Sequence, residues 1–298
     1  MDSRPEDSRA QATQPESGPG AGRARPARIL ALSTSGPWCS VALYRHGLGD
    51  DESDCVSEPL GAQQSMNILA MVDELCSGAR IEPSDLDAIV FDAGPGSFTG
   101  LRIGCAVAQG LGFALGLPLV AVDSLRALAW QRVRFGAHEA TVLAANDARR
   151  DEIYVAMYRI ARWPDDASGV DGAARLETLE APRIVARDRF VGEIDEWLRT
   201  HRWFAQASTL VRAGDAWVHA PTALAWDARF GSPLPPAPVA DDAYVRADAL
   251  AELGCADWHD GHAVSASKAV PRYLRDKVAL NRDEQREARE RSRTSCGE

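Results

Sequence analysis

Lysine, closely spaced cysteines and long apolar runs are scarce in this sequence, and each shortage excludes a class of protein. Only two of the 298 residues are lysines, Lys268 and Lys277, and neither follows a glycine-rich segment, so a Walker-type phosphate loop is excluded. The six cysteines form no CxxC pair, so buried free thiols in a reducing compartment fit better than a disulfide framework. No apolar run approaches the length needed to cross a bilayer, so we expect no contact with membranes.

The charge is concentrated in the centre of the chain. The formal net charge is −10, and residues 1–27 and 282–298 are each neutral by count, so the whole excess of acid lies between them. Contacts to phosphates need a basic surface. A core this acidic is therefore a poor sole binder of nucleic acid, and we expect any contact with RNA to be made through a complex.

The two ends of the chain differ in composition from its centre. Residues 1–27 are rich in Pro, Gly, Ser, Gln and Arg and have almost no large apolar side chains, which predicts a disordered N-terminal tail. This segment lacks the apolar core of a signal peptide, and its acidic residues argue against a transit peptide, so a cytoplasmic protein is expected. Residues 281–298 are nearly all charged or polar and predict a charged C-terminal tail.

Apolar periodicity between the tails predicts a mixed α/β fold. We expect strands at 28–34, 38–46 and 49–58, a helix at 63–78, a buried strand at 87–91, a helix at 99–115, a strand at 119–122, and a helix at 125–135 capped by Asp123-Ser124. Later elements are a hairpin at 140–146 and 152–160 and helices at 187–200 and 241–254. The order within 28–135 resembles one ribonuclease-H-like lobe of the actin-like and sugar-kinase ATPase fold, with 136–280 as the second lobe.

The most specific segment, residues 91–104, has the pattern of a strand, a glycine-rich turn and the start of a helix. Its glycines permit close backbone approaches that side chains block, and a hydroxyl residue beside them can cap the helix. In one interpretation the amides at the helix start cradle a phosphate or nucleotide; in the other the glycines serve packing only. The candidate residues for such a loop are Gly94, Gly96, Ser97, Thr99 and Gly100.

Several motifs in the same order resemble the TsaB (YeaZ) family between residues 28 and 280. They are Ile29–Ala31 with Cys39–Leu43, the segment Gly94–Gly104, Gly116–Leu125, Asn146–Arg149 with Glu152–Tyr154, and Pro271–Arg275. The resemblance implies two ribonuclease-H-like lobes of the actin-like fold. It also implies that the chain assists a catalytic paralogue, TsaD, together with the small ATPase TsaE. That assembly transfers a threonylcarbamoyl group to the adenosine beside the tRNA anticodon.

Reactive groups of the resembling superfamily are missing from this sequence. The related proteins usually carry Asp-Thr in the first hairpin, where this chain has Ser33-Thr34, and a neutral hydroxyl is a poor ligand for Mg²⁺. The catalytic paralogue holds a metal through two histidines on its first helix, and residues 64–75 contain none. We therefore expect a non-catalytic subunit with no metal and no cofactor beyond weak or vestigial nucleotide binding. The alternative is an ATP-dependent phosphotransferase, which the glycine loop favours and Ser33 opposes.

Small residues recur every four positions in the helix expected at 99–115. They form a flat stripe on which another helix can pack, at a cost of about 1 kcal/mol for each internal glycine. The occupant is either a helix of another subunit or the chain's own helix at 63–78. In the resembling family both helices contact TsaD or a second copy of the same protein. The candidate interface residues are Met66, Leu69, Ala70, Asp73, Gly104, Ala108 and Gly112.

Overall fold

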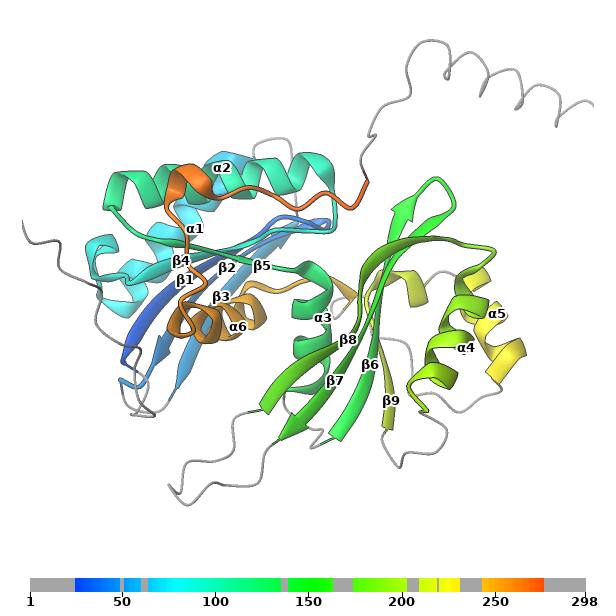
Figure 1. The fold of residues 1–298 in the computed structure, drawn as a ribbon. Coiled ribbons are helices and arrows are strands. Elements are labelled where there is room, and N and C mark those ends of the chain that lie inside the picture. Colours follow the sequence, from blue (N-terminus) through cyan, green and yellow to red (C-terminus); the bar gives the residue numbers. More distant parts are fainter. Residues whose placement is uncertain are drawn as a thin grey trace, which may run out of the picture.

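The computed structural model describes residues 25–48, 51–59, 64–134, 139–162, 174–202, 209–218, 220–230 and 243–275. These residues form two lobes, each built on one mixed sheet flanked by helices (Figure 1). Residues 1–24 and 276–298 lie outside the described part, and so do both predicted tails except for the end of the first. There, Ala27 already begins the first strand and Arg25 forms an ion pair with Asp87 at 2.9 Å.

The first lobe contains a five-stranded sheet in the order β3-β2-β1-β4-β5. Its strands are β1 (Ala27–Ser33), β2 (Trp38–His46), β3 (Glu52–Pro59), β4 (Ala88–Asp92) and β5 (Leu119–Val122). Strands β1, β4 and β5 run parallel, and β2 and β3 pair antiparallel at one edge. The helices α1 (Gln64–Ala79) and α2 (Phe98–Leu115) lie together on one face of this sheet (Figure 1). The sequence predicted each of these elements to within a few residues.

The second lobe contains a four-stranded sheet in the order β8-β7-β6-β9. Its strands are β6 (Glu139–Arg149), β7 (Glu152–Arg162), β8 (Ala174–Ala186) and β9 (Thr209–Ala213), and α4 (Phe190–Thr200) and α5 (Ala220–Phe230) cover its outer face. The predicted hairpin is β6–β7, and the predicted helix at 187–200 is α4. Strands β8 and β9 and helix α5 were not predicted from the sequence.

Two helices fill the space between the sheets and join the lobes. Helix α3 (Ser124–Val133) packs on β6, β7 and β9, and helix α6 (Ala247–His259) packs on β1, β2, β4 and β5 (Figure 1). One apolar cluster contains buried residues from both sheets and both helices. The helices also exchange charge-assisted hydrogen bonds, because Arg126 donates to Asp257 at 2.5 and 3.0 Å and Arg134 donates to Asp248 at 2.7 Å.

Helix α6 corrects the predicted lobe boundary. It follows the second sheet in sequence but packs on the first, so the assignment of all of 136–280 to the second lobe is wrong. The approach is close because Gly254 has no side chain: a Cβ there would lie 2.2 Å from Cγ2 of Val90. After α6, the segment 263–275, which we call the C-terminal strap, returns along α2, and Leu119 and Val264 exchange backbone hydrogen bonds of 2.8 Å (Figure 1).

Helix α2 is the one helix among the described residues that is long and apolar enough to cross a membrane. By that criterion, the expectation that no apolar run reaches this length was wrong. In this fold, however, α2 packs on β1, β4 and β5, and its buried side contributes to the apolar cluster on the outer face of the first sheet. Its apolar character is therefore accounted for by packing within the protein.

Replacing Gly254 with alanine tests how closely α6 approaches β4. The added methyl group overlaps Val90, so we expect Gly254→Ala to lower the free energy of unfolding by about 1–3 kcal/mol. The control is Gly192→Ala in α4, where a Cβ meets nothing within 4 Å and helix propensity raises stability by up to about 1 kcal/mol. Urea denaturation measures both, and equal effects of the two substitutions would contradict this packing.

Candidate functional site

The glycine-rich loop between β4 and α2 lies directly on the turn that joins β1 and β2. A Cβ on Gly96 would lie 2.7 Å from Cβ of Ser35, and one on Gly100 would lie 1.9 Å from the carbonyl oxygen of Thr34. Gly94 has a φ of +99°, which favours glycine. Close packing and backbone conformation thus account for all three glycines, as in the second of the two interpretations.

The start of α2 is held by its own capping residue. Ser97 is the N-cap, and its Oγ accepts a hydrogen bond of 3.3 Å from the Gly100 amide, whereas Thr99 is exposed within the first turn. The Ser97 amide donates to the Ser35 carbonyl at 2.8 Å, so this amide is already used in the fold. The Phe98 and Thr99 amides are in the first turn, where an α-helix has no acceptor of its own.

The hydroxyls of Ser33 and Thr34 and the carboxylate of Asp92 are all committed to internal hydrogen bonds. Ser33 donates to Asp92 at 3.0 Å, and Thr34 donates to the Gly100 carbonyl at 2.7 Å. Asp92 also accepts from the Ser124 hydroxyl and the Gly94 amide. Burial raises the pKa of the Asp92 carboxyl. These residues do not fit an Mg²⁺-nucleotide, which needs an anionic ligand free to reach the metal.

A second carboxyl, that of the half-buried Asp123, caps α3 as predicted. It accepts hydrogen bonds from the amides of Leu125 at 2.9 Å and Arg126 at 3.0 Å, and from the Tyr158 hydroxyl at 3.3 Å. Burial, assisted by the negative charge of Asp92, raises the pKa of Asp123 to about 6. The carboxyl therefore serves helix capping and the contact between α3 and β7.

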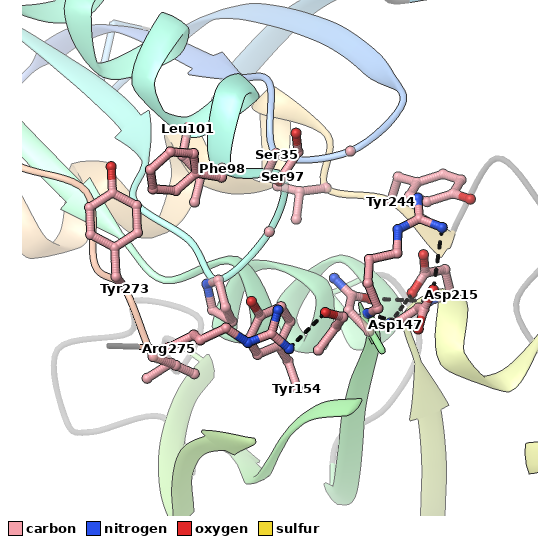
Figure 2. A pocket seen from close by; sticks show the side chains of 18 of the residues that line it. Ser35, Ser97, Phe98, Leu101, Asp147, Tyr154, Asp215, Tyr244, Tyr273 and Arg275 are labelled. Carbon is pink, nitrogen blue, oxygen red and sulfur yellow. Dashed lines mark hydrogen bonds and ion pairs between the residues drawn. The ribbon is translucent and has the colours of Figure 1, made fainter. Parts of the chain in front are cut away.

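A cavity of about 420 Å³ lies between the lobes. Figure 2 shows Ser35 and Ser97 on the side of the first lobe, with Tyr154, Asp147 and Asp215 opposite and Tyr273 and Arg275 from the strap at one end. The predicted loop residues Gly96 and Ser97 line this cavity, whereas Gly94, Thr99 and Gly100 do not. From the sequence, no site role was assigned to the aromatic and basic part of the lining, although most of it lies in the family motifs named above. This part is Phe98, Tyr154, Tyr244, Tyr273, Arg149, Arg272 and Arg275.

The stripe of small residues on α2 faces inward, which contradicts its predicted role as an exposed contact. Gly104, Ala108 and Gly112 are all buried. A Cβ on Gly104 would lie 2.5 Å from Oγ1 of Thr34, and one on Gly112 would lie 2.2 Å from Cδ1 of Leu119. These three positions therefore let α2 lie on the first sheet and its connections, and they are unavailable to a partner.

The neighbouring row of α2 is the exposed one. Ala106, Gly110 and Ala114 are exposed, and the Phe113 side chain beside them is 83% exposed. Of the candidates on α1, Leu69 is 46% exposed, and Ala70 and Asp73 are also exposed. The Met66 side chain lies outside the described part of the structure. We call the set Leu69, Ala70, Asp73, Ala106, Gly110, Phe113 and Ala114 the outer face.

The one close histidine pair in the sequence is used locally, as far as the structure describes it. The His259 ring nitrogens contact two backbone carbonyls, those of Cys255 and Arg25, each at 2.8 Å. His262 lies exposed beyond the end of α6. Among the described residues no group of three metal-ligating side chains converges.

The raised pKa of Asp123 predicts how stability depends on pH. The folded protein holds this proton more tightly than the unfolded chain, whose pKa is near 3.8, so the associated stability is present below about pH 4 and is lost as pH rises through about 6. Asp123→Asn keeps a capping side chain and removes this titration. We expect wild type to lose up to about 3 kcal/mol relative to the variant between pH 4 and 7.5. Parallel pH profiles in urea would contradict this.

Comparisons with known proteins agree on the family. The family model for TsaD, tRNA N6-adenosine threonylcarbamoyltransferase, matches residues 59–213. The tRNA threonylcarbamoyladenosine biosynthesis protein TsaB of Escherichia coli K12 is 30% identical over 256 residues, which cover 85% of this chain and 96% of that protein. TsaB of Haemophilus influenzae is 40% identical over 127 residues, or 42% of this chain and 51% of that protein.

Solved structures confirm the predicted fold. The structure of YeaZ from Pseudomonas aeruginosa has a TM-score of 0.60 and 32% identity, and the match covers 83% of this chain and all of that one. A second P. aeruginosa structure, described as similar to peptidase YeaZ, has a TM-score of 0.62 at 30% identity and covers 84% of this chain. The sequence motifs, the two-lobed fold and these relatives together place the chain in the TsaB (YeaZ) family of the TsaD-like superfamily.

Proposed function

We propose that this chain is a non-catalytic subunit required to form threonylcarbamoyladenosine on tRNA, and that it acts by docking on a TsaD-like catalytic paralogue. A TsaE-like ATPase completes the assembly, and tRNA is reached only through the complex, in the cytoplasm. The names of the TsaB relatives support a role in threonylcarbamoyladenosine biosynthesis. The match to the TsaD family model supports a common ancestry of this chain and a TsaD-like partner.

The observation that carries the docking role is the exposure of Phe113 on the outer face. A phenylalanine that is 83% exposed leaves a large apolar area in water, and such patches mark sites of association. Ala106, Gly110 and Ala114 surround it with small side chains, and a Cβ on Gly110 meets nothing within 4 Å. A partner helix can therefore approach α2 closely, and Phe113 can insert as an anchor into the groove between side chains of that partner helix.

The chemistry of the cleft supports a subunit without catalysis. Ser33 and Thr34 use their hydroxyls inside the fold, and the buried Asp92 accepts hydrogen bonds from Ser33, Ser35, Ser124 and the Gly94 amide. A phosphotransferase of this fold needs a carboxylate that can hold the nucleotide's metal, and this arrangement gives Asp92 no path to one.

The alternative, an ATP-dependent phosphotransferase, would have to use the carboxylates that line the cavity, Asp147 and Asp215. Asp147 pairs with Arg187 at 2.9 Å, and Asp215 accepts a hydrogen bond of 2.7 Å from the Asp147 amide.

Arginine at position 110 tests the outer face. We expect Gly110→Arg to fold, because the position is open and arginine favours helix more than glycine does. The long charged side chain then blocks helix approach, and affinity for the TsaD-like partner falls at least about a hundredfold in calorimetry. The matched control is Gly192→Arg, another open glycine in a helix, which should bind like wild type. Equal affinity of the two variants would contradict docking through α1 and α2.

Truncating Phe113 tests the anchor. We expect Phe113→Ala to weaken partner binding at least about tenfold, because a buried interface aromatic contributes about 2 kcal/mol or more. The reconstituted assembly with TsaE, ATP and the adenylate donor should lose tRNA modification in the same proportion, and the isolated chain should have none.

If the isolated chain is a homodimer through this face, light scattering should show Gly110→Arg as a monomer. If the Phe113→Ala assembly still modified tRNA fully when this subunit is limiting, Phe113 would not belong to the interface.

A further inference from the structure

The exposed apolar side chains of this protein are unevenly distributed over its surface. Among the described residues six large apolar side chains are exposed, and four of these lie on α1, α2 or the strap. The four are Leu69, Phe113, Val270 and Tyr273, with exposed fractions of 46%, 83%, 64% and 41%. Two of them belong to the outer face, and the two on the strap are not yet accounted for by the docking role.

The strap lies along one flank of α2 (Figure 1). Gln109 donates a hydrogen bond of 2.9 Å from its side chain to the Ala269 carbonyl, and nearer the start of the helix Arg102 donates to the Tyr273 hydroxyl at 3.2 Å. Ala269 is buried against the helix, whereas Val270 beside it is exposed. The exposed side chains of the strap therefore border the exposed row of α2 and continue the apolar surface of the outer face.

Arg102 stands where the outer face meets the strap. It is exposed and precedes Ala106 and Gly110 by four and eight residues, so helical spacing places all three in one row. Its guanidinium carbon lies 3.8 Å from the centroid of the Phe98 ring, and its Nε is the group that donates to the Tyr273 hydroxyl. Stacking and the hydrogen bond together fix the position of a positive charge at the surface.

No carboxylate pairs with Arg102 within the described part of the chain. Its side-chain contacts there are the Tyr273 hydroxyl and the rings of Phe98 and Tyr273. A guanidinium has several N–H donors, and those left over after the bond from Nε can bind a carboxylate or phosphate through two parallel hydrogen bonds. Because the side chain is already ordered, such a contact costs less conformational entropy than one made by a mobile arginine.

The surroundings of Arg102 favour a carboxylate on a protein over a phosphate of RNA. Val270, Tyr273 and Phe113 present apolar area, which a protein helix can cover and a sugar-phosphate backbone cannot. The outer face also carries the exposed Asp73, in a chain whose net charge is −10, and both repel a polyanion. An ordered arginine among apolar side chains is typical of the centre of a protein interface.

We propose that the docking surface for the TsaD-like partner extends from the outer face onto the strap, and that Arg102 binds a carboxylate of the partner helix that covers Phe113. This inference rests on the proposed function and specifies the chemistry of its contact. Eleven residues separate Arg102 from Phe113, which at a rise of about 1.5 Å per residue is about 17 Å along α2. A partner helix packed along α2 spans this length in about three turns, with an apolar groove at one end and an Asp or Glu at the other. The carboxylate thereby fixes the direction in which the partner helix lies.

Calorimetric titration of the full chain with the TsaD-like partner at low and high salt, about 50 and 500 mM NaCl, tests the charged contact. We expect Arg102→Gln to weaken binding at least about tenfold at low salt and to make the Kd less dependent on salt, because the substitution removes the charge and keeps a polar side chain. Arg189→Gln is the matched control, since Arg189 is an exposed arginine of the second lobe with no ion pair in the described part of the chain. It should bind the partner like wild type, with the same salt dependence.

A charge at position 270 tests the strap. We expect Val270→Asp to weaken partner binding at least about tenfold, because it introduces a carboxylate into an apolar contact and beside the carboxylate that Arg102 binds. Val218→Asp is the control, since Val218 is 52% exposed in the second lobe and should tolerate the same change without loss of affinity. Thermal melts check that all four variants are folded, as expected for substitutions at exposed positions.

Several results would contradict the proposal. Unchanged affinity of Arg102→Gln, or a weaker affinity with the salt dependence of wild type, would exclude the carboxylate contact. If Arg102→Gln bound the partner normally but lowered binding of tRNA to the assembly, the anion would be a phosphate. If it dissociated a homodimer and left partner affinity unchanged, the occupant would be a second copy of this chain.

Failure of this inference is separable from failure of the docking role. Loss of partner binding in Gly110→Arg, with none in Arg102→Gln or Val270→Asp, would leave the docking role standing and restrict it to the outer face. Normal binding by all three variants would overturn both.

Discussion

The contact of helix α2 with Thr34 is the constraint on which the rest of the structure depends. A Cβ on Gly100 would lie 1.9 Å from the Thr34 carbonyl oxygen, and one on Gly104 would lie 2.5 Å from its Oγ1. The Thr34 hydroxyl in turn donates to the Gly100 carbonyl at 2.7 Å. Only a helix without side chains at these positions can lie so close to the β1–β2 turn. This placement sets the glycine loop against the cavity and turns Phe113 toward water.

The same contact shows where sequence periodicity stops being informative. The spacing of Gly104, Ala108 and Gly112 correctly indicates close packing, but neither expected occupant, a helix of another subunit or the helix at 63–78, lies against Gly104 or Gly112. Here the neighbours are Thr34, Leu119 and the strap. The exposed row is offset around the helix, and its signal was Phe113, a large apolar residue among small ones. Fold and element order followed from local pattern, whereas the identity of a contact surface depends on tertiary packing.

Other differences have the same origin. Strands β8 and β9 and helix α5 lie among Pro- and Trp-bearing segments whose periodicity is weak, and their structure is set by packing on the second sheet. A helix was predicted at 241–254 and α6 spans Ala247–His259, but its lobe was predicted wrongly, because chain order gives no information about which sheet a helix covers. The sequence indicated only one part of the cavity lining, the glycine loop. Arg149 and Arg272 come from distant segments that the fold brings together.

The chain has the architecture of an actin-like fold, and the polar groups Ser33 and Asp92 hydrogen-bond to each other inside it. In the proposed function, the chain contributes a docking surface on α1 and α2 and no reactive group. Hydroxyl-radical footprinting with and without the TsaD-like partner tests this most directly. We expect the oxidation of Phe113 and Leu69 to fall on binding, while Val218 in the second lobe, 52% exposed, keeps its rate. Unchanged oxidation of Phe113, with protection appearing in the second lobe instead, would contradict it.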